Sequence, residues 1–300
     1  MTLGATERKF EGAIEAWLLV RGGYVKGDPR AFDRQLGLDP ADVLAFVEAT
    51  QPEEWSELAA RHGGEQAART NFLRRLAAEL DERGTVDVLR HGVKDLGIEI
   101  RLAYFKPAHS LTPELVARYD ANRLVLVRQL AYGADETKAI DLALLVNGIP
   151  VATAELKNPL TGQDVEHAID QYRRDRDPAN VTLARRAVVH FAVDSDLVAM
   201  TTRLAGEATQ FLPFNRGSED GGAGNPPNPA GHRTAYLWEE VWRRDAWLDL
   251  LGRFVHVVRP ETGSQAARRA GVRTVFPRFH QWDAVRKLEA HAREHGAGQS

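Results

Sequence analysis

The residues best suited to chemistry in this chain are two acids and a lysine in the segment IDLALLVNGIPVATAELKNP. Asp141 lies in the first apolar run, and Glu155 and Lys157 end the second, with Asn147-Gly148 between the runs. Hydrolysis of a phosphodiester bond needs carboxylates that hold a divalent cation and a positive charge near the attacking water. The segment therefore indicates a magnesium-dependent nuclease.

The acid-any-Lys pattern alone is weak, because it occurs at residues 7–9, 136–138 and 155–157. The first opens a helical stretch, where charges are ordinary caps, and the second lies in a polar turn. Only the third ends a strand-like run of β-branched and small residues. Side chains on one strand face repeat every two residues, so Glu155 and Lys157 share a face. Charged side chains at this position cost desolvation free energy unless they take part in binding or catalysis. The alternative interpretation is a structural salt bridge on an edge strand.

The register of the hairpin around Asn147-Gly148 decides whether the two acids meet. A two-residue turn with regular pairing would place Asp141 opposite Ala154 and send it away from Glu155. A three-residue loop with a bulge would place Asp141 opposite Glu155 on one face. Catalysis therefore predicts an irregularity at this turn, and Pro150, which has no N–H for the ladder, favours one.

The surrounding sequence predicts a mixed sheet with helices before it and one helix after its central hairpin, which is an α/β core. Strands are expected at 97–104, 122–130, 140–146, 149–157, 187–193 and 197–203. Helices are expected over the first 20 residues and at 40–61, 65–82, 163–175 and 236–251, with another beginning in the last segment. Residues 215–233 are expected to form a Gly/Pro/Asn-rich loop.

The composition is that of a globular protein, with 43% hydrophobic and 27% charged residues and no cysteine. Thiolate zinc sites and cysteine nucleophiles are thereby excluded. No apolar run approaches the roughly 20 residues that cross a bilayer, and no secretory signal opens the chain, so we expect a cytoplasmic protein without a membrane partner.

The net charge of −3 gives no overall basic surface for binding nucleic acid. A local cluster could be a solvated helix end or a phosphate contact: Arg173, Arg174, Arg176, Arg185 and Arg186.

Several segments, in the same order, resemble the N-terminal part of the restriction (R) subunit of type I restriction–modification enzymes. They are HGVKDLGIEIRLAYFKPA, IDLALLVNGIPVATAELKNPLTGQ, QYRRDRDP, VVHFAVDSDLVAMTTRLAG, FLPFNRG, GAGNPPNP and FPRFHQWDAVRKL. The resemblance implies a PD-(D/E)xK restriction-endonuclease-like fold, with a mixed sheet flanked by helices and helical additions at both ends. It implies a nuclease domain over 1–259 with its core at about 85–205, a linker at 260–271, and the start of a helicase-like motor at 272–300.

The resemblance also assigns roles to residues. It makes Asp141 and Glu155 the metal acids, with the Leu156 carbonyl as a further ligand, and Lys157 the catalytic lysine. It implies an acid in the first helix, for which Glu11 is preferred over Glu7 and Glu15.

Two further assignments follow from the same family. Gln171 matches the glutamine of a Gln-x-x-x-Tyr motif, but Asp175 stands where the tyrosine belongs and Tyr172 lies next door. Near the C-terminus, Phe276 and Gln281 match the residues that read adenine at the entrance to the motor.

The leading hypothesis is a Mg²⁺-dependent endonuclease region of a type I site-specific deoxyribonuclease that cleaves double-stranded DNA. Its expected partners are DNA and the methyltransferase and specificity subunits. The segment at 296–300 is not a GxxxxGK[ST] loop, so ATP is expected only in full-length relatives, and this chain is expected to be truncated. One alternative is a non-catalytic DNA-binding or subunit-docking fragment, which an exposed Trp-rich patch at 236–251 would favour. Another is a stand-alone nuclease of the exonuclease type.

Overall fold

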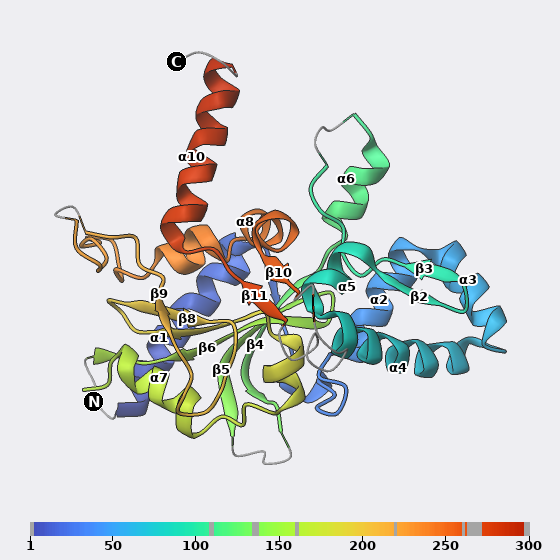
Figure 1. Ribbon diagram of the computed structural model, residues 1–300, viewed down its shortest axis with the longest axis horizontal. Coiled ribbons are helices and arrows are strands. Elements are labelled where there is room, and N and C mark those ends of the chain that lie inside the picture. The colour runs from blue at the N-terminus through green and yellow to red at the C-terminus, as the bar shows by residue number, and fades with distance from the viewer. Residues whose placement is uncertain are drawn as a thin grey trace.

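The computed structural model describes residues 3–107, 111–133, 138–159, 162–218, 221–259, 262 and 272–296, and for residues 3–7 it describes only the backbone. The predicted linker at 260–271, apart from residue 262, lies outside these residues. The chain is a mixed α/β structure in which helices flank a seven-stranded sheet (Figure 1). The predicted α/β fold class is therefore confirmed, and the arrangement is consistent with a restriction-endonuclease-like fold.

The central sheet has the strand order β1-β4-β5-β6-β7-β8-β9. β1 pairs in parallel with β4, and β6 pairs in parallel with β7, whereas the other neighbouring strands are antiparallel. The strands span Tyr24–Lys26 (β1), Leu124–Ala131 (β4), Ala139–Val146 (β5), Ile149–Leu156 (β6), Val189–Val193 (β7), Val198–Thr201 (β8) and Leu212–Pro213 (β9). Every residue of β6 is buried, as expected for a central strand covered on both faces.

Different helices cover the two faces of this sheet. α1 (Leu3–Trp17) and α8 (Arg244–Asp249) contribute to the large core on one face. α7 (Val165–Arg174) packs against the other face, where Ala168 and Ile169 meet Ala192 of β7. Short π-helical or 3₁₀ turns connect several elements: Leu18–Gly22, Pro29–Ala31, Thr182–Arg186, Leu237–Val241 and Leu250–Phe254.

A second group of helices lies beside the sheet, on the right in Figure 1. It consists of α2 (Pro40–Thr50), α3 (Pro52–Arg61), α4 (Glu65–Arg83) and α5 (Thr85–His91), with the hairpin β2 (Val93–Asp95) and β3 (Ile98–Ile100). The expected single helix at 40–61 is wrong, because Pro52 starts a new helix and Gln51 leaves helical geometry at φ −144°. The expected strand at 97–104 is also too long, and it pairs with β2 instead of joining the central sheet.

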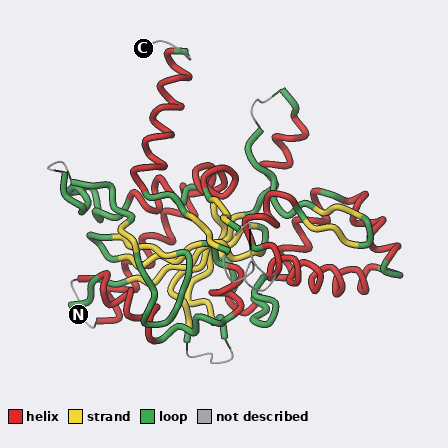
Figure 2. Tube along the Cα trace, in the orientation of Figure 1, coloured by secondary structure: helices red, strands yellow, loops and turns green. Residues whose placement is uncertain are grey.

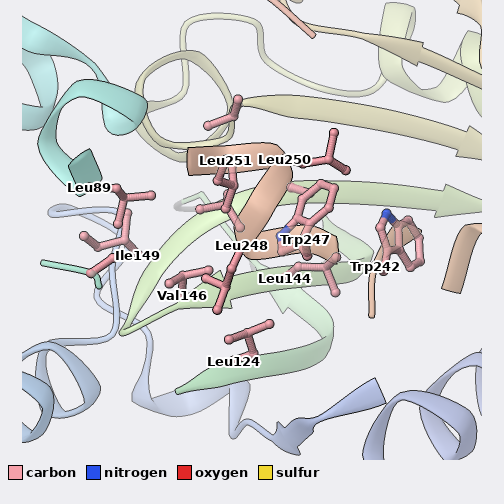
Figure 3. Close-up of a cluster of buried hydrophobic side chains, with 14 of the residues drawn as sticks. Leu89, Leu124, Leu144, Val146, Ile149, Trp242, Trp247, Leu248, Leu250 and Leu251 are labelled. Carbon is pink, nitrogen blue, oxygen red and sulfur yellow. The ribbon is translucent and has the colours of Figure 1, made fainter. Parts of the chain in front are cut away.

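The apolar segment at 236–251 is core, but it is not one helix. It forms a π-helical turn, then α8, then the start of a second π-helical turn. Trp242 and Trp247 are fully buried, and Figure 3 shows the side chains of this segment over Leu144 and Val146 of β5. The exposed Trp-rich patch that would favour a docking fragment is therefore not formed by these tryptophans.

Loops join these elements at the rim of the molecule, as Figure 2 shows. The described residues of the 215–233 segment contain neither helix nor strand, as its Gly, Pro and Asn content predicts. α6 (Pro113–Asp120) and α10 (Phe279–His295) both project from the body (Figure 1). Among the described residues, no helix is both long enough and apolar enough to cross a bilayer.

The C-terminal segment is anchored in the main core, although α10 projects from it. A small hairpin of β10 (His256–Val258) and β11 (Arg273–Val275) leads into α10. Phe276, Phe279 and Trp282 are buried in the same cluster as the core of the central sheet. The division of the chain at 259 and 272 stays a prediction.

The Asn147-Gly148 hairpin contains the irregularity that catalysis requires, but not in the expected place. The loop has two residues, since Val146 pairs with Ile149, and Leu145 pairs with Pro150. The register then shifts, and Leu144 pairs with Ala152, which leaves Val151 as the extra residue of the bulge. Pro150 precedes this point and has no N–H to donate, so it is compatible with a break in the ladder. The expected three-residue loop is wrong, whereas the predicted register change is confirmed.

The close approach of the turn to α2 makes Gly148 a sensitive position. Its φ is +81°, and a Cβ there would lie 2.5 Å from the Asp39 carbonyl oxygen and 2.8 Å from the Val43 nitrogen. We expect Gly148→Ala to destabilise the protein by roughly 3 kcal/mol, combining left-handed backbone strain with overpacking. Gly63→Ala is the control, because Gly63 has φ +79° but no atom within 4 Å of the added Cβ. Equal losses in urea denaturation of the two variants would contradict this account.

Candidate functional site

Three acids gather at one end of the central sheet. The pairing of Leu142 with Ala154, continued by one residue, sets Asp141 opposite Glu155. Glu11 reaches the same place from α1, where Gln129 Nε2 lies 3.0 Å from Glu11 Oε1 and 3.1 Å from Asp141 Oδ1. The structure thus brings together the two acids of the hairpin and the preferred acid of the first helix.

Asp141 is oriented by two hydrogen bonds, one to each carboxylate oxygen. The Leu156 backbone N–H donates to Oδ2 at 2.8 Å, and the Gln129 amide donates to Oδ1. The N–H and C=O of one strand residue point to the same side of the strand. The Leu156 carbonyl is therefore directed to the Asp141 side of β6, as its assignment as a further ligand requires.

Glu155 is fully buried, and only one of its two carboxylate oxygens has a hydrogen-bond partner among the described residues. Its Oε1 accepts a hydrogen bond from Arg176 Nε at 2.6 Å, while its Oε2 has no hydrogen-bond partner among the described residues. Burial, helped by the negative charge of Asp141 and opposed by Arg176, raises the pKa of Glu155 to about 8. A buried carboxylate with an open oxygen beside a second acid is costly by itself, and a cation would offset that cost.

Glu11 is also buried and is held by Arg128. The Arg128 guanidinium lies 2.6 Å from Glu11 Oε2 and 2.7 Å from Glu15 Oε2. Burial raises the pKa of Glu11, with a further contribution from the Asp141 charge. Glu15 instead pairs with Lys26 and Arg128, which lower its pKa. The side chain of Glu7 lies outside the described residues.

Lys157 follows the last residue of β6, and its backbone holds it in place. Its N–H donates to the Val193 carbonyl at 2.8 Å, which continues the pairing with β7. The side chain is partly exposed, and its charge acts on Glu155 by lowering the pKa of that carboxyl. Lys157 therefore lies close enough to the acids for its charge to act on Glu155, and its residue is partly exposed.

Gln171 lies on α7 next to Tyr172, and the two side chains differ in accessibility. Gln171 is partly exposed, whereas Tyr172 is fully buried and its hydroxyl lies 2.8 Å from Thr153 Oγ1. Thr153 Oγ1 also lies 2.7 Å from Nδ1 of His190, whose pKa burial lowers to about 4. Tyr172 therefore fastens α7 to β6 beneath the acids and is not exposed at the site.

The C-terminal pair of candidates does not form an open ligand site. Phe276 is 4% exposed, and its ring lies 6.0 Å from those of Phe191 and Phe214. The Gln281 side chain accepts a hydrogen bond from the Arg278 N–H at 2.9 Å and caps α10. Phe276 is therefore part of the core, and its assignment to an adenine stays a prediction.

The arginine cluster divides between the interior and the surface. Arg176 and Arg186 are buried, the first against Glu155 and the second against Asp81 at 2.6 Å. Arg174 and Arg185 are exposed. The cluster is therefore neither a simple solvated helix end nor one continuous phosphate-binding surface.

Sequence reasoning missed three residues that hold the acids: Arg128, Gln129 and Arg176. Arg176 belonged to the noted cluster, but its pairing with Glu155 carried no local signal. Arg128 and Gln129 end a strand-like run directly before the hairpin of the acids, and that position was the available clue.

The raised pKa of Glu155 predicts a pH-dependent stability. The folded protein keeps this proton up to about pH 8, while an unfolded chain releases it near 4.5. The contribution of this proton to the free energy of unfolding is therefore complete below pH 4.5 and is lost as the pH rises toward 8. We expect Glu155→Gln to match the wild type at pH 5 and to exceed its stability by roughly 2–4 kcal/mol at pH 9. Urea denaturation at both pH values checks this, and a constant difference would contradict it.

Comparison with known proteins supports the resemblance found in the sequence. No curated protein matches the chain. Residues 80–209 match the family model described as the type I restriction enzyme R protein N terminus. The matched segment contains Asp141, Glu155, Lys157 and all of the hairpin that positions them. Residues 80–209 of this chain are therefore similar to the N terminus of the type I restriction enzyme R protein.

Proposed function

We propose that this chain is the Mg²⁺-dependent nuclease region of a type I restriction enzyme and that it hydrolyses phosphodiester bonds of double-stranded DNA. The observation that carries the proposal is the buried Glu155 beside Asp141, with its Oε2 unpartnered among the described residues. Methyltransferase and specificity subunits are the proposed protein partners.

The residues present fit a magnesium ion by their chemistry. Mg²⁺ takes oxygen ligands, and Asp141, Glu155 and the Leu156 carbonyl would supply them, with Glu11 next to the group. Among the described residues, no set of three or more acids and histidines is arranged to hold a metal as it stands. Arg176, Arg128 and Gln129 engage oxygens of these acids, so the group has to rearrange when a cation binds.

Each residue has a separate role in the proposed reaction. Bound Mg²⁺ would polarise the phosphoryl oxygen and lower the pKa of a bound water. Lys157 orients the attacking water or stabilises the negative charge that develops on the phosphate, as a compact charge with rotatable donors can do. Arg176 and the Leu156 N–H hold Glu155 and Asp141, and Gln171 lies on the adjoining helix, positioned to contact the DNA backbone.

Cleavage of supercoiled DNA tests the proposal. The 300-residue chain should nick the DNA only with Mg²⁺, and Asp141→Ala and Lys157→Ala should nick it far more slowly. Equal residual cleavage by all three proteins would contradict the nuclease function and favour the fragment that binds or docks without cutting.

A further inference from the structure

Gln129 has an unusual backbone conformation beside the acids. It lies in β4 opposite Asp141, between Arg128, which pairs with Leu142, and Leu130, which pairs with Ile140. Its φ is +50°, which side chains other than glycine, asparagine and aspartate rarely adopt, and the register on either side is unchanged. Strained backbone conformations persist where the surrounding structure holds them and are frequent at functional sites, so the contacts of the Gln129 side chain are of interest.

The strained conformation places the Gln129 amide between two carboxylates from different elements. Its Nε2 donates to Glu11 Oε1 at 3.0 Å and to Asp141 Oδ1 at 3.1 Å, and one NH₂ group has the two hydrogens this requires. Among the described residues, the charged and backbone donors hold the other oxygen of each carboxylate: Arg128 donates to Oε2 of Glu11, and the Leu156 N–H donates to Oδ2 of Asp141. The amide thus joins a carboxylate of the first helix to a carboxylate of the hairpin, and these are oxygens that a cation would also attract.

We propose that Gln129 is a displaceable substitute for the cation: it holds Glu11 and Asp141 together before Mg²⁺ binds and moves out when Mg²⁺ enters. This inference rests on the proposed function, which supplies the cation. The Gln129 residue is exposed, so its amide can turn into solvent without disturbing the core.

The inference predicts effects of opposite sign at one position. Gln129→Asn and Gln129→Gly tolerate the positive φ and remove the bridge, so Mg²⁺ no longer competes with an amide. We expect the Kd for Mg²⁺, measured by calorimetry without DNA, to fall about fivefold, which corresponds to about 1 kcal/mol. Gln129→Lys places a tethered ammonium between the acids, and we expect its Kd to rise more than tenfold. Loss of a merely structural residue would weaken Mg²⁺ binding in all three variants.

A matched control separates the amide from the backbone. Leu96 is exposed and also has a positive φ, of +45°, but lies in the β2–β3 turn, so Leu96→Gly relieves similar strain elsewhere. Its Kd for Mg²⁺ should equal that of the wild type. A Kd for Gln129→Asn and Gln129→Gly that is equal to or weaker than that of the wild type would overturn the inference.

Failure of this inference is distinguishable from failure of the proposed function. If the wild type binds Mg²⁺ and Asp141→Asn does not, while the Gln129 variants bind as the wild type does, only the role of Gln129 is overturned. If the wild type gives no Mg²⁺ binding that depends on Asp141, both are overturned.

Discussion

Lys157→Ala is expected to lower Mg²⁺-dependent nicking by about 10²–10³-fold, because it removes the positive charge that would face the developing negative charge on the phosphate. Asp141→Asn is expected to cost about 10³-fold or more, since it removes a charged ligand of the cation and with it several kcal/mol of transition-state stabilisation. Nicking of supercoiled DNA, measured as an initial rate at saturating Mg²⁺, checks both values.

These losses should be separable from unfolding. Lys157 is partly exposed, and an asparagine at position 141 keeps an oxygen that can accept the hydrogen bond from the Leu156 N–H. We therefore expect the thermal midpoints of both variants to stay near that of the wild type. Lys138→Ala is the matched control, because Lys138 is an exposed lysine near the start of the strand that carries Asp141. Loss of nicking in Lys138→Ala would show that general surface charge, and not the position of Lys157, is responsible.

Arg176→Met is expected to destabilise the protein by roughly 3–5 kcal/mol at pH 9. The Arg176 side chain is 4% exposed, and it joins Glu155 to the Ala139 carbonyl, to which its Nη2 donates at 2.7 Å. Without the guanidinium, the buried Glu155 carboxyl at high pH is either charged without a partner or protonated at a pH where the solvent favours its ionised form. Either state costs free energy. At pH 5 Glu155 is protonated, so the loss should shrink to the hydrogen bonds and packing of Arg176 alone, roughly 1–3 kcal/mol.

Two comparisons isolate this pair. Arg174→Met removes an arginine that is 65% exposed and makes only a 3.5 Å contact with Asp170, so its cost should be below about 1 kcal/mol. Combining Glu155→Gln with Arg176→Met should recover much of the loss at pH 9, because no buried charge is then left without a partner. An equal loss for Arg176→Met at pH 5 and pH 9 would show that Glu155 does not depend on this arginine for its charge.

The local parts of the fold were predictable because local sequence specifies them. A continuous apolar run around one acid identified β5, and alternation of residues identified β6. The Asn-Gly pair identified their turn, and helical periodicity identified α4 and α7. The bulge was predictable only from the demand that Asp141 face Glu155. Its position was wrong, because the Asn147-Gly148 turn keeps two residues and the extra residue is Val151, after the proline.

The partners of the acids could not be predicted, because they come from distant positions in the chain. Glu11 and Arg128 are 117 residues apart, and nothing in either segment signals their contact. Gln129 has a positive φ within β4, and propensity alone gives a glutamine no reason to adopt it. Phe276 matched a functional pattern in sequence but is core in the structure, since residues of the central sheet and of α8 pack around its ring.

The sequence by itself singled out the residues proposed to do the chemistry, which are Asp141, Glu155 and Lys157 on a hairpin, in a segment that resembles a known family. Residue type and strand alternation are enough for that. Only the tertiary structure decided the pKa values and hydrogen-bond partners of these residues, because burial and contacts between distant parts of the chain set both. Burial beside Asp141 raises the pKa of Glu155, Arg176 holds one of its oxygens, and Gln129 joins Asp141 to the acid of α1.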